Sequence, residues 1–220
     1  MDILEIMKSR HSVRQYTDKK IEPEKRRILN GLAEKCNAES GLNIQVIYDE
    51  PKCFDSMMAH YGKFSGCKNY IAVVGKKSKD LDEKAGYYGE KLVLKAQELG
   101  LNTCWVAMTH GKSTAKIEKG EKLAIIISLG YGKNQGVAHK SKKMSDVCSQ
   151  TDKVPAWFTK GMEAVLLAPT AMNQQKFKFT LKGDEVEAVA TGGFYSKIDL
   201  GIVKYHFEAV SGHKVNGCEL

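Results

Sequence analysis

Apolar and polar residues follow one another along the first half of the chain in patterns that predict helices separated by short strands. A first long helix is expected at residues 23–34, where a proline suits the opening turn and isoleucine and leucine side chains form one face. Runs of apolar and β-branched residues predict strands at residues 44–48 and 70–74. The clearest helix is expected at residues 88–99, because its apolar side chains repeat at helical spacing and Gly100 follows as a stop.

The second half of the chain gives the same kind of alternation. Residues 123–129 are continuously apolar, which is typical of an interior strand covered on both faces. A further helix is expected from Pro155 to Ala168, where the next residue is a proline and disfavours helical geometry before it. Alternating positions on both sides of a Gly-Asp turn predict a hairpin at residues 177–190, and a last helix is expected at residues 198–210.

The composition of the chain indicates the number of domains and the cellular compartment to expect. The 220 residues are 42% hydrophobic and 27% charged, which is ordinary for a globular protein, and the lysine-rich stretch 133–153 reads as a surface connection within one domain of residues 1–220. No apolar run is long enough to cross a membrane, and the N-terminus lacks the features of a signal peptide. Six scattered cysteines without metal-ligand spacing predict reduced thiols, no metal site and a cytoplasmic protein.

The formal net charge of +8 admits a nucleic acid, an acidic surface or an anionic small molecule as a partner. The lysines are spread along the whole chain, with one dense cluster at residues 140–143. No basic motif with interleaved aromatic residues, such as the RNA-recognition signature, is present. We therefore expect most lysines to be solvated and expect neither a nucleic acid nor a membrane as partner.

The segment Arg10–Arg14 is the first candidate site. If it is extended, Arg10, Ser12 and Arg14 fall at period two and face the same side. Two guanidinium groups beside a hydroxyl suit an anion, most naturally a phosphate, because guanidinium binds oxyanions through paired hydrogen bonds. On this segment alone, a solvated basic turn explains the sequence equally well.

The stretch from Ala168 to Gln175 is the second candidate site. Its small residues at a helix end allow a flat ligand to approach the backbone. Thr170, Asn173 and Gln175 add hydroxyl and amide groups that can pair with a ring edge carrying both donors and acceptors. Taken alone, a capped helix end followed by a polar strand start is the simpler interpretation.

Other motifs favour structural interpretations. The glycines of residues 130–136 are spaced G-x-G-x-x-x-G, one residue too long for a dinucleotide loop, and no apolar-periodic helix follows them. His206 lies on the apolar face of its predicted helix and is expected to be a hydrogen-bonded core residue. No catalytic arrangement of side chains is evident, so if the protein is an enzyme we expect a cofactor to carry the chemistry.

The two candidate sites together indicate a specific ligand. A phosphate fits Arg10 and Ser12 with Lys140 or Lys142, and a planar heterocycle fits the amide-bearing loop near Asn173. Positive charge near one ring edge favours an anionic reduced form. These requirements describe flavin mononucleotide (FMN).

The same stretches carry a resemblance to a known family. Residues 10–16 match R-x-S-x-[RK]-x-[FY], residues 90–105 are similar to a central helix and the turn after it, and residues 168–175 match A-P-[ST]-A-x-N-x-Q. With the lysines of residues 140–143, these motifs resemble the nitroreductase family of FMN-dependent oxidoreductases. The A-P-T stretch follows the central helix here, whereas in most of the family it precedes it. That order resembles a smaller bacterial and archaeal branch.

The resemblance implies an α/β (α+β) protein with a three-layer fold, in which helices flank a central mixed sheet. It also implies a homodimer with two FMN sites at the interface. Arg10 and Ser12 would hold the phosphate and ribityl end of FMN, His11 would pack alongside, and Arg14 would stabilise negative charge at N1 and O2 of the ring. Lys140 and Lys142 would contact the phosphate.

The ring end of the implied site comes from two further segments. In the A-P-T stretch, which begins at Ala168, Pro169 and Thr170 would line the ring, Asn173 would pair with its polar edge, and Gln175 is a second choice for that role. The backbone of Val106 and Ala107 would lie near N5.

The implied activity is a ping-pong transfer of a hydride from NADH or NADPH through flavin N5 to a nitroaromatic, a quinone or a similar electron-poor acceptor. No side chain is expected to act as a catalytic acid or base. Two alternatives stay open at this point: a non-catalytic FMN-binding protein, such as a flavin reservoir, redox sensor or ferredoxin-linked carrier, and a basic nucleic-acid-binding protein.

Overall fold

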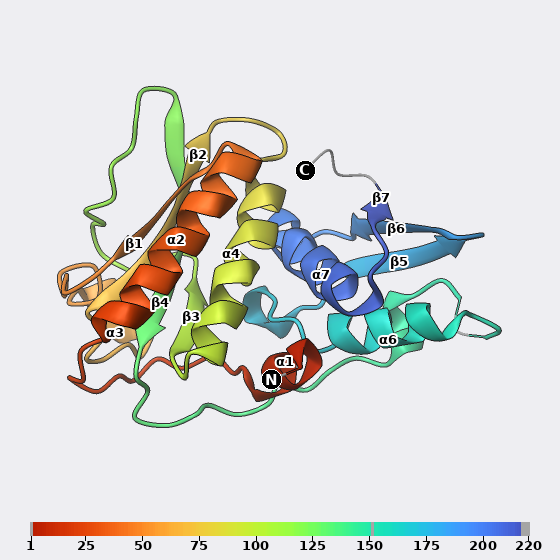
Figure 1. The fold of residues 1–220 in the computed structure, drawn as a ribbon, viewed down its shortest axis with the longest axis horizontal. Helices are drawn as coiled ribbons and strands as arrows, with labels where there is room; N and C mark the ends of the chain where they lie inside the picture. Colours follow the sequence, from red (N-terminus) through yellow and green to blue (C-terminus); the bar gives the residue numbers. More distant parts are fainter. Residues whose placement is uncertain (1, 151, 217–220) are drawn as a thin grey trace.

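The computed structural model describes residues 2–150 and 152–216 and contains a four-stranded antiparallel main sheet (Figure 1). Its order is β1 (Asn43–Ile47), β2 (Asn69–Lys76), β4 (Glu121–Gly130) and β3 (Asn102–Val106). Strand β4 lies between two neighbours, and Ile126 and Ile127, which point to opposite faces, are both fully buried. The prediction of an interior strand covered on both faces is therefore confirmed.

Two long helices pack on one face of the main sheet, as Figure 1 shows. Helix α2 (Pro23–Ser40) packs on β1 and ends at Gly41, whose left-handed φ of 70° favours glycine. Helix α4 (Leu81–Glu98) contacts β2, β3 and β4. The last helix, α7 (Ser196–Ser211), packs closely against α4. The two helices approach where both carry glycine. A Cβ on Gly86 or on Gly201 would lie 2.0 Å from a backbone oxygen of the other helix.

The opposite face of the main sheet is covered by irregular chain. Helix α1 (Ile3–Ser9) leads into an extended segment that crosses the sheet edge, and residues 50–67 with the short helix α3 (Met57–Tyr61) add an aromatic cluster. Phe54 packs against Phe64 with ring centroids 4.9 Å apart. This face is where the N-terminal candidate site meets the core.

A second, three-stranded sheet follows later in the chain. Strands β5 (Phe177–Lys182) and β6 (Glu185–Ala190) form the predicted hairpin, and β7 (Val215–Asn216) pairs with β6 in parallel. Two helices, α5 (Met144–Val147) and α6 (Ala156–Val165), and the short 3-10 helix η1 (Ala171–Asn173) precede the hairpin. One continuous apolar core joins both sheets through α4 and α7.

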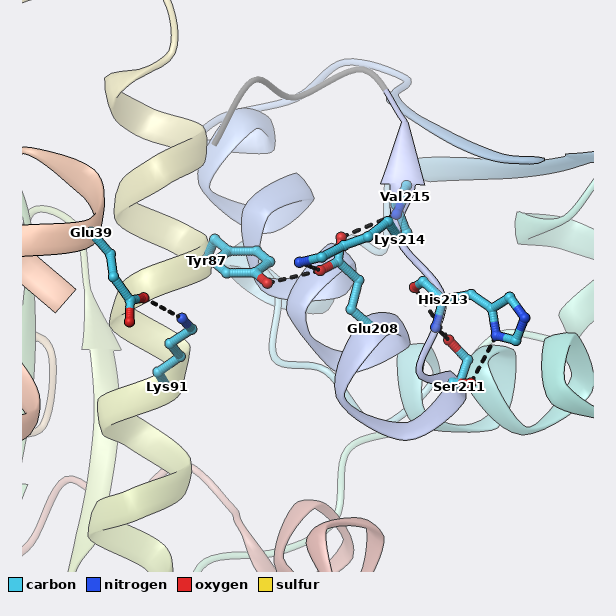
Figure 2. Close-up of polar contacts among 8 residues, drawn as sticks. All are labelled: Glu39, Tyr87, Lys91, Glu208, Ser211, His213, Lys214 and Val215. Carbon is cyan, nitrogen blue, oxygen red and sulfur yellow. Dashed lines mark hydrogen bonds and ion pairs between the residues drawn. The ribbon is translucent and has the colours of Figure 1, made fainter. Parts of the chain in front are cut away.

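The end of α7 is tied to α4 and to β7 by one carboxylate, drawn in Figure 2. Glu208 accepts hydrogen bonds from the Tyr87 hydroxyl at 2.8 Å, from Lys214 Nζ at 2.7 Å and from the Val215 backbone N–H at 3.0 Å. Burial and this carboxylate raise the pKa of Tyr87. The small sheet is thus fixed to the helical layer.

The α+β fold class is confirmed, with differences in detail. The four strands of the main sheet pair antiparallel rather than in a mixed arrangement, whereas β6 and β7 pair in parallel and Ser12 forms an isolated parallel bridge with Thr103 of β3. Helix α2 continues to Ser40 and α4 begins at Leu81, so both exceed their predicted ranges. Within the described ranges, no helix combines the length and apolarity needed to cross a membrane.

Candidate functional site

The N-terminal wall of the candidate site is an extended segment held at the edge of the main sheet. The Val13 N–H donates to the Thr103 carbonyl at 3.0 Å, and the Tyr16 N–H donates to the Ser65 carbonyl at 2.9 Å. Val13 is buried in the core, while Arg10, Ser12 and Arg14 all line one cavity of about 310 Å³. The predicted period-two arrangement of these three side chains is therefore confirmed.

The C-terminal wall comes from the loop between α6 and β5. Pro169, Thr170 and Met172 line the 310 Å³ cavity and also a neighbouring cavity of about 110 Å³. Ser12 and Arg14 line both cavities as well. We call these two adjoining cavities the cleft. The structure thus brings together two candidate segments that lie far apart in the sequence, and both belong to one chain.

Arg10 is the electrostatic centre of the larger cavity. Its side chain is only 4% exposed, and its Nε and Nη1 atoms have no hydrogen-bond partner among the described residues. Burial lowers the pKa of Arg10, and the nearby Glu90 carboxylate opposes that shift. Burying an unpaired ion costs on the order of several kcal/mol, and an anion bound in the cavity would offset this cost. The position therefore suits a phosphate or another oxyanion.

The loop of the C-terminal wall has a strained backbone. Met172, Asn173 and Gln175 have φ values of 50°, 53° and 45°, in the left-handed region that costs residues other than glycine roughly 1 kcal/mol each. The Asp199 carboxylate of α7 accepts hydrogen bonds from the Ala171 N–H at 2.9 Å and from Gln174 Nε2 at 2.7 Å. Burial raises the pKa of Asp199 to about 6, against these hydrogen bonds.

The polar groups of this loop are partly committed to the segment at residues 140–142. Asn173 Nδ2 and Gln175 Nε2 each donate to the Lys140 carbonyl at 2.9 Å. Lys142 donates its ammonium group to the Gln175 carbonyl at 2.9 Å and its backbone N–H to Gln175 Oε1 at 2.8 Å. Gln175 is buried, whereas Asn173 is exposed and lines the larger cavity.

The other predicted site residues are distributed unevenly around the cleft. Ala107 lines the smaller cavity, whereas Val106 is buried in the core beside it. His11, Ala168, Lys140 and Lys142 are not among the residues that line the cleft. His11 packs beside Gly136, and Ala168 is buried under the loop that begins with it.

Strand β3, whose last residue Val106 was a predicted site residue, supplies a further lining residue that the sequence analysis did not assign. Trp105 lines the smaller cavity and donates its indole N–H to Glu90 at 3.0 Å. Glu90 also lies 2.9 Å from His206 Nε2, and His206 Nδ1 lies 2.9 Å from the Ala164 carbonyl. Both ring nitrogens therefore lie within hydrogen-bond distance of an oxygen inside the core. His206 is fully buried, so its predicted core role is confirmed.

Further lining residues were not predicted from the sequence, among them Met172, Tyr195 and Asp199. Met172 is 83% exposed at the edge of both cavities, and Tyr195 and Asp199 line the smaller one. Asp199 carried a usable signal, because it is an acid next to Ile198 on the face that α7 buries. Met172 and Tyr195 carried none, since their left-handed conformations come from the tertiary structure.

A cavity of about 410 Å³ also lies among α1, α2 and α4. Two of its lysines, Lys91 and Lys95, form ion pairs with Glu39 and Glu98. The pair of Lys91 and Glu39 appears in Figure 2. Although larger, this cavity lacks a buried unpaired cation of the kind that Arg10 provides, so the cleft is the better candidate site.

Comparisons with known proteins agree with this assignment of the fold. No curated protein matches this chain, whereas solved structures do. A crystal structure of a nitroreductase from Thermotoga maritima matches with a TM-score of 0.70 and 23% identity, covering 96% of this chain and 83% of that one. A structure from Desulfovibrio desulfuricans, determined in complex with FMN, matches with a TM-score of 0.54 and 18% identity, covering 70% and 98%.

A third solved structure, an NADH dehydrogenase/NAD(P)H nitroreductase from Bacteroides thetaiotaomicron, matches with a TM-score of 0.52 and 18% identity over 69% of this chain and 98% of that chain. At these identities the likeness shows the fold. The family model described as "Putative TM nitroreductase" matches residues 2–211, which is nearly the whole chain. The chain therefore belongs to this nitroreductase family.

Proposed function

We propose that the chain is an FMN-dependent oxidoreductase that acts as one domain, with the cleft as its cofactor site. The observation that carries the proposal is Arg10, a buried guanidinium with two unpartnered nitrogens at the wall of the larger cavity. A flavin phosphate supplies the anion that this group needs. The FMN-bound relative from Desulfovibrio desulfuricans, which shares the fold, supports the choice of flavin over other anions.

The residues that line the cleft can be matched to the parts of FMN, from the phosphate at one end to the ring at the other. Arg10 and Ser12 would hold the phosphate and ribityl end, since both line the larger cavity. Pro169 and Thr170 would line the ring, because they border both cavities. Arg14 is exposed and borders both cavities, so its charge is available to stabilise an anionic ring edge. Lys140 would add long-range attraction for the phosphate, since the Lys142 ammonium is already bonded to Gln175.

When bound, FMN supplies two-electron redox chemistry at N5, which we propose moves a hydride from NAD(P)H to a nitroaromatic, quinone or similar acceptor in a ping-pong sequence. The chain contributes surroundings for that chemistry. Ile125, Ile198 and Ile202 line the smaller cavity with apolar side chains, which would help to keep water from a bound ring. The NADH dehydrogenase and NAD(P)H nitroreductase names of the Bacteroides thetaiotaomicron relative support the choice of hydride donor.

A homodimer remains part of the proposal, as the family resemblance implies. Both walls of the cleft come from one chain. Each protomer therefore carries the arginines and the A-P-T loop of its own site, and a partner would add to the cleft rather than complete it.

The test is an absorbance spectrum of the purified protein, followed by anaerobic addition of NADH and NADPH. We expect flavin bands that are bleached by at least one of the two nucleotides and that return when a quinone or a nitroaromatic is added. A protein that binds FMN but is not reduced by either nucleotide would be a flavin carrier or sensor instead. A colourless protein that does not take up FMN would contradict the proposal as a whole.

A further inference from the structure

Two loops with left-handed backbone conformations lie together beside the smaller cavity. The first is residues 170–175, which contains Met172 and Asn173 in that region. The second is residues 191–195, in which Gly192, Gly193 and Tyr195 have φ values of 110°, 97° and 57°. Backbone in this region persists in residues other than glycine only where surrounding contacts fix it. The contacts that fix these two loops therefore determine the shape of the cleft at this end.

Gln174 joins the two loops. Its Nε2 donates to the Phe194 carbonyl at 2.8 Å and to Asp199 Oδ2 at 2.7 Å. Gly193 leaves the space for this amide, since a Cβ at that residue would lie 2.1 Å from Gln174 Oε1. The second loop is therefore shaped around the Gln174 side chain.

Asp199 anchors this arrangement to helix α7. Its Oδ1 accepts the Ala171 N–H at 2.9 Å, so one carboxylate holds both the start of the first loop and the Gln174 amide. The residue is 3% exposed, and among residues 2–150 and 152–216 its carboxylate contacts the Gln174 amide and the Ala171 N–H rather than a cation. A buried carboxylate without a cationic partner contributes little to the stability of the fold. Burial disfavours its charged form, and this raises the pKa of Asp199. The burial of Asp199 is better explained by its hydrogen bonds to the Ala171 N–H and the Gln174 amide.

We propose that Asp199 and Gln174 are positioning residues that hold the 170–175 loop against the flavin ring and thereby set the affinity of the cleft for FMN. The inference rests on the proposed function for the identity of the ligand. It adds two residues to which we assign no direct role in holding the phosphate or the ring, because the Asp199 carboxylate, although it lines the smaller cavity, is bonded to Ala171 and Gln174. Both act on Pro169, Thr170 and Met172, which line the cleft, through the backbone that connects them.

The test compares Asp199→Ala and Gln174→Ala with the control Asp184→Ala, which removes an exposed carboxylate from the β5–β6 turn. In flavin-free protein, we expect amide hydrogen exchange to become at least ~10-fold faster at residues 170–175 and 191–195 in both variants, with other helices and strands unchanged. FMN affinity, measured by fluorescence titration, should fall by about 10-fold or more, which corresponds to the loss of one or two hydrogen bonds. The visible circular dichroism of any bound flavin should also change.

The control should match the unsubstituted protein in all three measurements. Faster exchange spread over α4, α7 and the main sheet would mean that the two residues only stabilise the fold, and would overturn the proposal. Unchanged exchange at residues 170–175 would overturn it as well. If Asp199→Ala does not fold, Gln174→Ala decides, because Gln174 is partly exposed and leaves the bond between Asp199 and Ala171 in place. The exchange measurement needs no flavin, so its result is separate from failure of the proposed function.

Discussion

The two walls of the cleft are built by different means. The N-terminal wall, residues 10–16, is bonded through its backbone to β3 and to Ser65, and it buries Val13 and Tyr16 in the core. The C-terminal wall, residues 170–175, depends on hydrogen bonds made by the side chains of Asp199, Gln174 and Thr170 and contains left-handed residues.

This difference has a consequence for ligand binding. A segment bonded like a strand keeps its shape whether or not the cavity is filled, so the N-terminal wall presents preorganised cations. A strained loop held by a few side chains has a shape that single substitutions can change. We therefore expect changes in the first wall to affect binding strength through charge, and changes in the second wall to affect it through geometry.

The largest effect is expected from Arg10→Ala, which removes the buried cation of the first wall. FMN affinity should fall by about 100-fold, or ~3 kcal/mol, because hydrogen bonds to charged groups contribute about 1.5–3 kcal/mol each. The matched control is Arg14→Ala, which removes the same charge from an exposed position in the same segment. We expect only a several-fold loss there. Equal losses in the two variants, measured by fluorescence titration, would show that Arg10 is not the phosphate ligand.

The next effect concerns the second wall and depends on pH. Because burial raises the pKa of Asp199 to about 6 from its ordinary 3.8, the folded protein binds a proton between these values that the unfolded chain does not. This group therefore favours folding at pH 4, and that contribution is lost as the pH rises to 6, by on the order of 2–3 kcal/mol. The measurement is the free energy of unfolding of the unsubstituted protein minus that of Asp199→Asn. We expect this difference to fall between pH 4 and pH 6 and to stay level above pH 6. A difference that rises with pH would refute the assignment.

A smaller effect is expected from Tyr16→Phe in the first wall. The buried hydroxyl donates to the Val13 carbonyl and lies 2.7 Å from both that oxygen and Ser128 Oγ. Its removal should lower the free energy of unfolding by about 1–2 kcal/mol, since buried acceptors lose a donor. FMN affinity should change little because the backbone bonds to β3 remain. Urea denaturation beside a flavin titration tests both statements, and a large loss of affinity with unchanged stability would contradict the comparison of the walls.

The smallest effect is expected from Met172→Gly, which relieves strain in the second wall. Met172 has a φ of 50° and an 83% exposed side chain, so glycine removes the backbone cost and sacrifices little burial. The free energy of unfolding should rise by up to about 1 kcal/mol. The control Met58→Gly, at a residue of helix α3, should lower it instead. A loss of stability in Met172→Gly comparable to that in the control would mean that the loop is not strained.

The features that the sequence predicted well are those that depend on local alternation. The period-two reading of Arg10, Ser12 and Arg14 needs only an extended backbone, and the burial of His206 follows from its position on an apolar helix face. The start of α4 was predicted too late. Gly86 lowers helix propensity locally, but it is needed there because α7 packs against it.

The part that could not be predicted is the support of the second wall. Asp199 bonds to Ala171 and Gln174, which come close only when α7 folds back on the loop. The left-handed conformation of Met172 opposes its intrinsic preference and is set by those contacts. The sequence signal for such tertiary contacts is at most an isolated acidic residue on the apolar face of a helix, as at Asp199.

The most direct test of the account is a pair of equilibrium titrations, one with FMN and one with riboflavin, which differs only in lacking the phosphate. If the buried Arg10 binds that phosphate, FMN should bind about 100-fold more tightly than riboflavin, and Arg10→Ala should remove most of the difference. Equal affinities of the unsubstituted protein for the two flavins would contradict the central claim that the cleft recognises FMN through Arg10.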